Sequence, residues 1–183
     1  MKLFLIRHTS TACPAGLCYG RTEVPLADTF REEAAAVRAA LPPHPWRVFS
    51  SPASRCRRLA EYLGGPVQID PRLQELDFGS WENRPWAELP REDTESWLGD
   101  FVHRGPPGGE SFGDLAGRAC GFLKELSACP ASPPIVVVTH AGVIRALLAL
   151  AQGQALADAF ARPIAFGCVQ ALNIGPDRLV SLP

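Results

Sequence analysis

The sequence lacks both a strong charge excess and a long apolar run. Its 183 residues carry 18 Lys and Arg against 19 Asp and Glu, a formal net charge of −1. The basic stripe of a nucleic-acid-binding surface is therefore absent, and we expect no nucleic-acid partner. Only four apolar residues follow Lys2 before Arg7, too few for a signal-peptide core, and no run reaches membrane-spanning length. We therefore expect no membrane partner and a cytoplasmic location.

Cysteine is also sparse, with six residues at scattered positions: 13, 18, 56, 120, 129 and 168. Cys13 and Cys18 form a C-x4-C pair, but no second pair or nearby His completes a zinc-binding set. We expect reduced thiols, no metal and no cofactor. An apolar fraction of 46% and a charged fraction of 20% are typical of a globular protein, and the length suits a single domain over residues 1–183.

Short apolar runs alternate with helical patterns along most of the chain. This alternation predicts an α/β fold, doubly wound, with a mostly parallel central sheet flanked by helices. For one helix we expect an N-terminus with Ser51 as N-cap and Pro52 in the first turn. Strands are predicted at residues 3–6, 48–49, 67–69 and 135–138, helices at 28–41, 51–63, 111–127 and 141–151, and a closing hairpin from 166–174 and 178–182 around 175–177.

The pattern breaks down between about residues 70 and 109. Trp81, Trp86 and Trp97 are scattered there among acids and prolines, with no clear strand. We interpret this stretch as a cap insertion over one edge of the sheet, with short helices at 85–89 and 92–102. Trp81 and Trp86 could line a pocket for an aromatic substrate, but we favour the interpretation that they pack the cap against the core.

Two of the predicted strands end in histidine, at Ile6-Arg7-His8 and at Val138-Thr139-His140. If these strands are parallel neighbours, they lie about 4.8 Å apart and both histidines project at one edge, where ligands of open α/β sheets bind. His140 also begins a helix, whose N-terminus favours an anion. A single such histidine could be merely a hydrogen-bonded edge residue. Two at equivalent strand ends, one beside Arg7, predict an anion site.

Two further segments carry groups that suit phosphate chemistry. Arg55 follows a predicted strand in Ser51-Pro52-Ala53-Ser54-Arg55 and offers a planar fork of donors for phosphate oxygens. The segment 73–82 places acids among large apolar residues, where burial favours a carboxyl group that keeps its proton. Spacing alone does not decide which acid would act.

Five motifs together resemble the histidine phosphatase (phosphoglycerate mutase-like) superfamily, in the order that the family shows. They are Arg-His-Thr at 7–9, Ser-Ser-Pro-x-x-Arg at 50–55, Leu-x-Glu-x-x-Phe-Gly-x-Trp-Glu at 73–82, Gly-Gly-Glu-Ser at 108–111 and Val-Thr-His-Ala-Gly at 138–142. The resemblance implies a metal-independent phosphomonoesterase that forms a phosphohistidine. In it His8 is the nucleophile, Arg7, Arg55 and His140 hold the phosphoryl oxygens, and Glu75 donates a proton to the leaving alcohol.

The loop after the first strand bears on the substrate. Residues 16–27, from Gly16-Leu17-Cys18-Tyr19-Gly20-Arg21 onward, resemble the α-ribazole phosphatases of cobalamin assembly, which act on α-ribazole 5′-phosphate or the corresponding adenosylcobalamin 5′-phosphate. This resemblance adds Tyr19, Gly20, Arg21 and Ala141 as candidate substrate-binding residues. Tyr19 could equally be packed in the loop, and Arg21 could be a surface cation.

Pro14 departs from the family pattern, because many members have an Asn at this place. Proline has neither a side-chain amide nor a backbone donor, so one phosphate contact is missing or comes from another group. A broad-specificity or phosphoprotein phosphatase with the same site remains an alternative, as does a non-catalytic phosphate-binding module. Helices on an open sheet also leave room for a homodimer.

Overall fold

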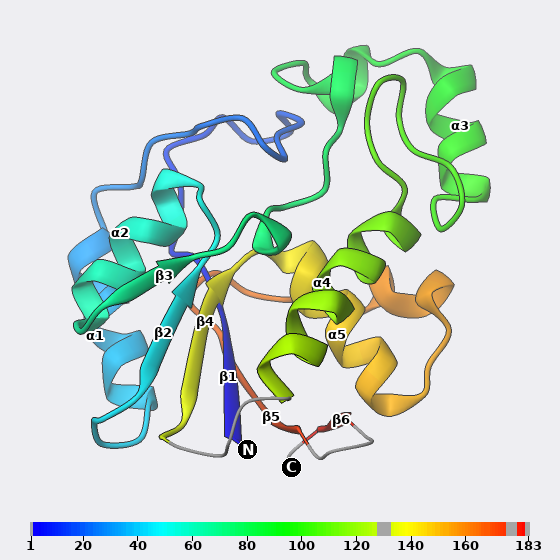
Figure 1. Ribbon diagram of the computed structural model, residues 1–183. Coiled ribbons are helices and arrows are strands. Elements are labelled where there is room, and N and C mark those ends of the chain that lie inside the picture. The colour runs from blue at the N-terminus through cyan, green and yellow to red at the C-terminus, as the bar shows by residue number, and fades with distance from the viewer. Residues whose placement is uncertain (1, 128–132, 175–178, 182–183) are drawn as a thin grey trace.

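The computed structural model describes residues 2–127, 133–174 and 179–181, and its centre is a six-stranded sheet (Figure 1). The strand order is β3-β2-β4-β1-β5-β6. The first four positions are parallel: β3 (Val67–Ile69), β2 (Arg47–Ser50), β4 (Ile135–Thr139) and β1 (Lys2–Arg7). The antiparallel strands β5 (Val169–Ile174) and β6 (Leu179–Ser181) complete the sheet. The predicted mostly parallel α/β sheet and its closing hairpin are confirmed; residues 175–177 lie outside the described residues.

Helices cover both faces of the sheet, as the doubly wound prediction requires. On one face lie α1 (Phe30–Ala40) and α2 (Ser54–Leu63), and on the other α4 (Phe112–Ser127) and α5 (Ala141–Gln152) (Figure 1). Alternate residues of a strand point to opposite faces. Val136 and Val138 of β4 accordingly pack with α1 and α2, whereas Ile135 and Val137 pack with α4 and α5. This two-sided burial explains why the central strands are uninterrupted apolar runs.

The register of β1 and β4 brings their carboxyl ends together. Leu3 to Arg7 pair in parallel with Ile135 to Thr139, so that Arg7 lies opposite Thr139. The backbone N–H of His8 then donates to the carbonyl of Thr139, which extends the ladder by one residue. The prediction that the two strands are neighbours is confirmed, and both histidines follow directly after the paired residues.

The predicted N-terminus of the second helix is wrong by two residues. α2 begins at Ser54 with Ala53 as its N-cap. Ser51 instead continues from β2, because its backbone N–H donates to the carbonyl of Val138. Its hydroxyl lies 2.8 Å from Nε2 of His140 and also accepts the backbone N–H of Ala53 at 3.4 Å, so Ser51 precedes the helix without being its N-cap residue.

Residues 70–109 lie above the carboxyl ends of the parallel strands (Figure 1). They contain the short 3-10 turns η1 (Pro71–Leu73), η2 (Gly79–Trp81) and η3 (Trp86–Glu88), and the helix α3 (Arg91–Gly99), which ends three residues before the predicted boundary. A further 3-10 segment, η4 (Leu156–Ala161), follows α5. The rings of Trp81 and Trp97 meet at 5.7 Å, so aromatic packing stabilises a segment that has no regular sheet or long helix.

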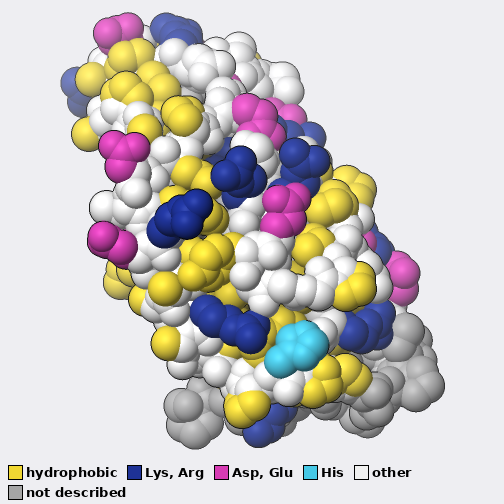
Figure 2. Space-filling model, turned by 90° about the vertical axis from the view of Figure 1, so that its left-hand side faces the viewer, with side chains coloured by type: hydrophobic (Ala, Val, Ile, Leu, Met, Phe, Trp, Pro, Cys, Tyr) yellow, Lys and Arg dark blue, Asp and Glu magenta, His cyan; other side chains and the backbone are white. Residues whose placement is uncertain are grey.

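The outer surface mixes side-chain types. Figure 2 shows cationic and anionic side chains interspersed with apolar ones over the face that carries α1 and α2. Among the residues that the structure describes, every helix is too short or too polar to cross a bilayer.

Candidate active site

His8 and His140 meet at the edge where β1 and β4 end. Their ring centroids are 5.2 Å apart and their planes are inclined by 67°. Only 2% of His8 and 1% of His140 is exposed to solvent. The arrangement follows directly from the strand register, and it places two imidazoles against each other with little surrounding water.

Hydrogen bonding fixes the tautomer of His8. Its Nδ1 lies 2.8 Å from the carbonyl oxygen of Thr9, which can only accept, so Nδ1 carries the proton. Nε2 then keeps a lone pair. Burial, followed by the positive charge of Arg55, lowers the pKa of His8 to about 3, although the bond to Thr9 opposes this shift. His8 is therefore a neutral imidazole with a free nucleophilic nitrogen near neutral pH.

His140 has partners for both ring nitrogens. The guanidinium of Arg55 lies 3.4 Å from Nδ1 and can only donate, so Nδ1 accepts and Nε2 donates to the Ser51 hydroxyl at 2.8 Å. Burial and the neighbouring His8 and Arg55 lower the pKa of His140 well below its usual range. No local sequence pattern indicated that Ser51 would orient this ring.

Arg7 is held by the segment before β5. One of its terminal nitrogens donates to the carbonyl of Ile164, and its guanidinium carbon lies 3.7 Å from the centre of the Phe166 ring. The same ring lies 5.5 Å from His8. Phe166 thus supports both residues of the Arg-His pair, and no local sequence pattern could have indicated a contact across about 160 positions.

Arg55 is fixed by the loop that follows β1. It is 1% exposed, and its two terminal nitrogens donate to the carbonyls of Thr22 at 2.8 Å and Gly20 at 2.6 Å. Gly20 has no space for a side chain, because a Cβ there would lie 1.9 Å from the carbonyl oxygen of Leu76. The Nε groups of Arg7 and Arg55 are buried donors without a partner among the described residues, as expected where an anion supplies the acceptor.

Glu75 lies on an irregular segment between η1 and η2. Its carboxylate accepts the backbone N–H of Gly142, in the first turn of α5, at 3.1 and 3.2 Å, and that of Leu76 at 3.0 Å. The segment itself is held by Arg118 of α4, which donates to the carbonyls of Arg72, Gln74 and Glu75. The N-terminus of α5, predicted to favour an anion, therefore faces a carboxylate of the same chain.

A pocket of about 210 Å³ collects these groups. Its walls comprise the five predicted catalytic residues, the predicted substrate-binding residues Tyr19 and Ala141, and four more: Leu17, Phe78, Trp86 and Arg145. Tyr19 and Trp86 therefore line the pocket. Arg145 could have been found from the sequence, because it lies four residues after Ala141 and on the same helix face.

Three residues singled out in the sequence lie outside the pocket wall. Arg21 pairs with Asp77 at 3.1 Å and Glu110 at 3.3 Å, and so acts as a structural cation there. Gly20 contributes the carbonyl that holds Arg55. Pro14 is exposed at the surface.

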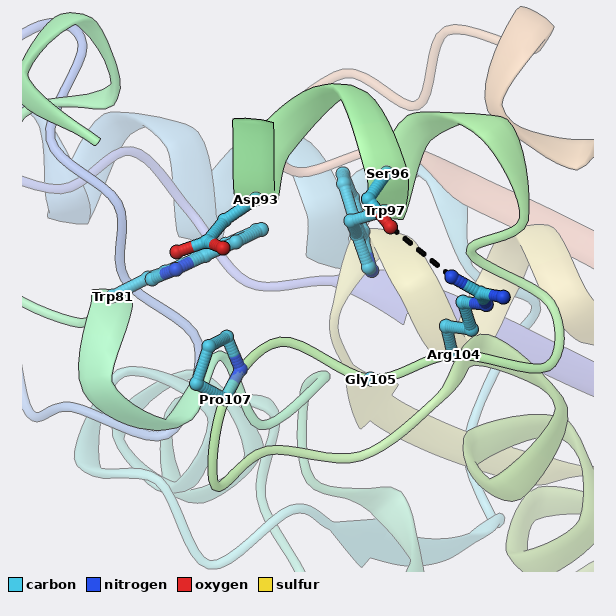
Figure 3. Close-up of a pocket in the computed structure, with 7 residues that line it drawn as sticks. All are labelled: Trp81, Asp93, Ser96, Trp97, Arg104, Gly105 and Pro107. Atoms are coloured by element: carbon cyan, nitrogen blue, oxygen red, sulfur yellow. Dashed lines mark hydrogen bonds between the residues drawn. The ribbon is translucent and has the colours of Figure 1, made fainter. Parts of the chain in front are cut away.

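A second cavity, of about 420 Å³, lies within the cap (Figure 3). The indole rings of Trp81 and Trp97 form part of its wall, together with Asp93, Ser96 and Arg104, and Arg104 donates to the Ser96 hydroxyl at 3.1 Å. It contains none of the predicted catalytic residues. Trp81 thus packs in the cap, and its ring lies against that of Trp86 with the centroids 6.0 Å apart.

Metal-ligating groups are scattered in the described part of the chain, where no three His, Cys, Asp or Glu side chains gather as a metal site would require. The five described cysteines, at 13, 18, 56, 120 and 168, are free thiols. Cys129 lies outside the described residues. The pocket itself supplies donors for an anion: a neutral imidazole lies with guanidinium groups that can neutralise phosphoryl oxygens, and a carboxyl group lies beside them.

Comparison with known proteins defines the class. The family model of the histidine phosphatase superfamily (branch 1) matches residues 3–182, and the chain belongs to this superfamily of phosphatases. The adenosylcobalamin/alpha-ribazole phosphatase of Salmonella typhimurium is 33% identical over 95% of this chain and 91% of that protein. The crystal structure of the alpha-ribazole phosphatase from Shigella flexneri superposes with a TM-score of 0.89 at 29% identity, over 100% of this chain and 95% of that one.

A relative with a different name is nearly as similar. The glucosyl-3-phosphoglycerate phosphatase of Mycolicibacterium vanbaalenii is 32% identical over 83% of this chain and 74% of that protein. The activity that follows from the family is therefore phosphatase activity on a phosphate ester.

Proposed function

We propose that this phosphatase removes the 5′-phosphate of α-ribazole 5′-phosphate or of adenosylcobalamin 5′-phosphate through a phosphohistidine on His8. The observation that carries the chemistry is the neutral His8, whose Nδ1–H is bound by Thr9 and whose Nε2 is free, in one pocket with Arg7, Arg55 and Glu75. A neutral nucleophile approaches a phosphoryl dianion without charge repulsion.

In the first step Nε2 of His8 attacks phosphorus, and the P–N bond forms as the bond to the ester oxygen breaks. Arg7 and Arg55 neutralise the charge on the phosphoryl oxygens. Protonated Glu75 gives its proton to the leaving oxygen, which departs as an alcohol. In the second step water attacks phosphorus, ionised Glu75 takes its proton, and the P–N bond breaks to release inorganic phosphate and neutral His8.

The pocket walls support an aromatic leaving group. Three aromatic rings line the pocket together with the charged residues: those of Trp86, which is 38% exposed, Phe78 and Tyr19. Such rings can stack on a benzimidazole through their faces and edges. The Salmonella and Shigella relatives are named as phosphatases of alpha-ribazole or adenosylcobalamin esters, which supports the same substrate class.

The substrate proposal is tested by kcat/KM on a panel. We expect α-ribazole 5′-phosphate to exceed 3-phosphoglycerate, sugar phosphates and a phosphopeptide by at least about tenfold, or roughly 1.4 kcal/mol of transition-state binding. Equal values across the panel would replace the proposal by the alternative of a broad-specificity phosphatase.

The intermediate is tested by trapping. Enzyme quenched during turnover should carry an acid-labile, base-stable phosphoryl group, and His8→Ala should neither be labelled nor turn over. His103→Ala is the matched control, since His103 is an exposed histidine paired with Asp100 at 2.7 Å, remote from the pocket. Continued turnover by His8→Ala would exclude the phosphohistidine. A homodimer, which the sequence left open, is tested separately by light scattering.

A further inference from the structure

Arg145 is a cation of the pocket for which the proposed mechanism has no role. It lies on α5, and its Nε donates to the carbonyl of Arg162 at 2.9 Å. Its guanidinium carbon lies 5.3 Å from the centre of the Phe160 ring. These two contacts fix the plane of the guanidinium, while the group lines the same pocket as His8 and Glu75.

The two terminal nitrogens of Arg145 are unused. Within the part of the chain that the structure describes, neither has a hydrogen-bond acceptor and neither takes part in an ion pair. Neither is among the buried polar atoms without a partner, so both are open to solvent at the pocket wall. Arg145 therefore presents a preoriented fork of donors, which suits a carboxylate or a phosphate oxygen pair.

The charge balance of the pocket points the same way. Its wall holds three guanidinium groups, from Arg7, Arg55 and Arg145, and one carboxyl group, from Glu75. A phosphate monoester brings about two negative charges near neutral pH. When Glu75 carries the proton that it donates, the occupied pocket keeps one positive charge in excess. This count rests on the proposed function, because it uses Glu75 as the acid.

We propose that Arg145 forms a subsite for a second anionic group on the leaving group of the substrate. Between phosphate monoesters with otherwise similar leaving groups, the subsite favours the one that carries a carboxylate or a phosphodiester a few bonds from the ester oxygen. Of the two substrates proposed above, the cobalamin ester carries a phosphodiester on the same ribose, and α-ribazole 5′-phosphate does not.

Two matched pairs of compounds test the subsite and separate its two sources of negative charge. Glycerol 3-phosphate and 3-phosphoglycerate differ only in a hydroxymethyl group against a carboxylate. Thymidine 5′-phosphate and its derivative with a methyl phosphate on the 3′-oxygen differ in a 3′-phosphodiester that carries only a methyl group beyond it. For each compound, kcat/KM is measured with the native enzyme and Kd by calorimetry with His8→Ala.

We expect the native enzyme to favour the doubly anionic member of at least one pair. Arg145→Gln should lose about 10- to 100-fold on that member and change less than about threefold on the singly anionic one, the difference that one charged hydrogen-bonding group makes. Arg145→Lys should keep part of the preference. Arg38→Gln, which removes another helix arginine that donates to a carbonyl, is the control and should keep all of it.

If Arg145→Gln lowers kcat/KM equally for both members of each pair, the subsite is overturned. Arg145 would then have only a structural role, through its hydrogen bond to the carbonyl of Arg162. An absence of preference in the native enzyme would also overturn it. A failure of the proposed function would look different. His8→Ala would then turn over substrate, or His8 would carry no phosphoryl label, while the Kd values would still differ within each pair of compounds. A response confined to one pair identifies a carboxylate or a phosphodiester as the second anion.

Discussion

Replacing Arg118 should damage the proton-transfer step more than the phosphoryl site. Arg118 donates at 2.7 Å to the carbonyls of Arg72 and Gln74 and at 3.1 Å to that of Glu75, and Glu110 holds it in place. The backbone around Glu75 has no helix or strand of its own to fix it. Arg118→Ala removes all three donors at once, so Glu75 loses its fixed position relative to the leaving oxygen.

The magnitude follows from the contacts. Three carbonyls lose a charged donor, but the side chain is 17% exposed, so water replaces part of each bond. At about 1 kcal/mol per bond the free energy of unfolding falls by about 3 kcal/mol, and Tm by roughly 6–12 °C for a chain of this length. General acid catalysis contributes about 10²–10⁴-fold, so kcat on an alkyl phosphate should fall by roughly 10²-fold.

The assay compares leaving groups. p-Nitrophenolate departs without a proton, so kcat on p-nitrophenyl phosphate should fall less than about tenfold, below the range that general acid catalysis supplies. Glu75→Gln, which removes the proposed acid itself, shows how kcat on the two substrates changes when general acid catalysis is lost. Arg38→Ala is the matched control, because Arg38 also donates to a backbone carbonyl, that of Leu63 at 2.6 Å, far from the site. If both substrates slow by the same factor in Arg118→Ala, Arg118 supports the fold and not the acid.

Three further outcomes are expected. Gly20→Ala should lower kcat/KM roughly 10²-fold, because its Cβ would meet the Leu76 carbonyl oxygen at 1.9 Å and displace the loop that holds Arg55. The free energy of unfolding should fall as the pH drops from about 6 to 4, by about 1.4 kcal/mol per pH unit from His8 alone. The reason is that the pKa of His8, about 3 in the folded protein, lies below its ordinary value of 6.5, so the unfolded chain binds the proton first. Dialysis against EDTA should leave the activity unchanged, because the described residues hold no cluster of metal ligands.

Each of these outcomes has a direct control. Circular dichroism separates a local shift in Gly20→Ala from unfolding, and full activity in the folded variant would contradict the close contact. Urea titrations at several pH values should give a shallower pH slope for His8→Asn than for the native protein, and parallel slopes would contradict the shifted pKa. Loss of activity in EDTA that returns with added metal would contradict metal independence.

The fold was largely predictable because its signals are local. Runs such as Ile135 to Val138 are apolar at every position, as strands buried on both faces must be, and the helical patterns between them fix the alternation of an α/β sheet. The error at Ser51 shows the limit of such signals. A Ser-Pro pair favours a helix start locally, but Ser51 pairs with Val138 and contacts His140, both more than 80 residues away in sequence, and the helix begins after it.

The sequence by itself determined which chemical groups the site could contain. Two apolar runs that each end in histidine, an arginine after a third strand and acids among apolar residues predict an anion site, and the five motifs that resemble the histidine phosphatases make the anion a phosphoryl group. Tertiary structure alone decided how those groups are held: Phe166 beneath Arg7, Arg118 behind Glu75 and the unused donors of Arg145 in the pocket. The reason is physical: periodicity reports burial along one element, whereas each of these contacts joins segments far apart in the chain, and only the packed sheet and helices bring them together.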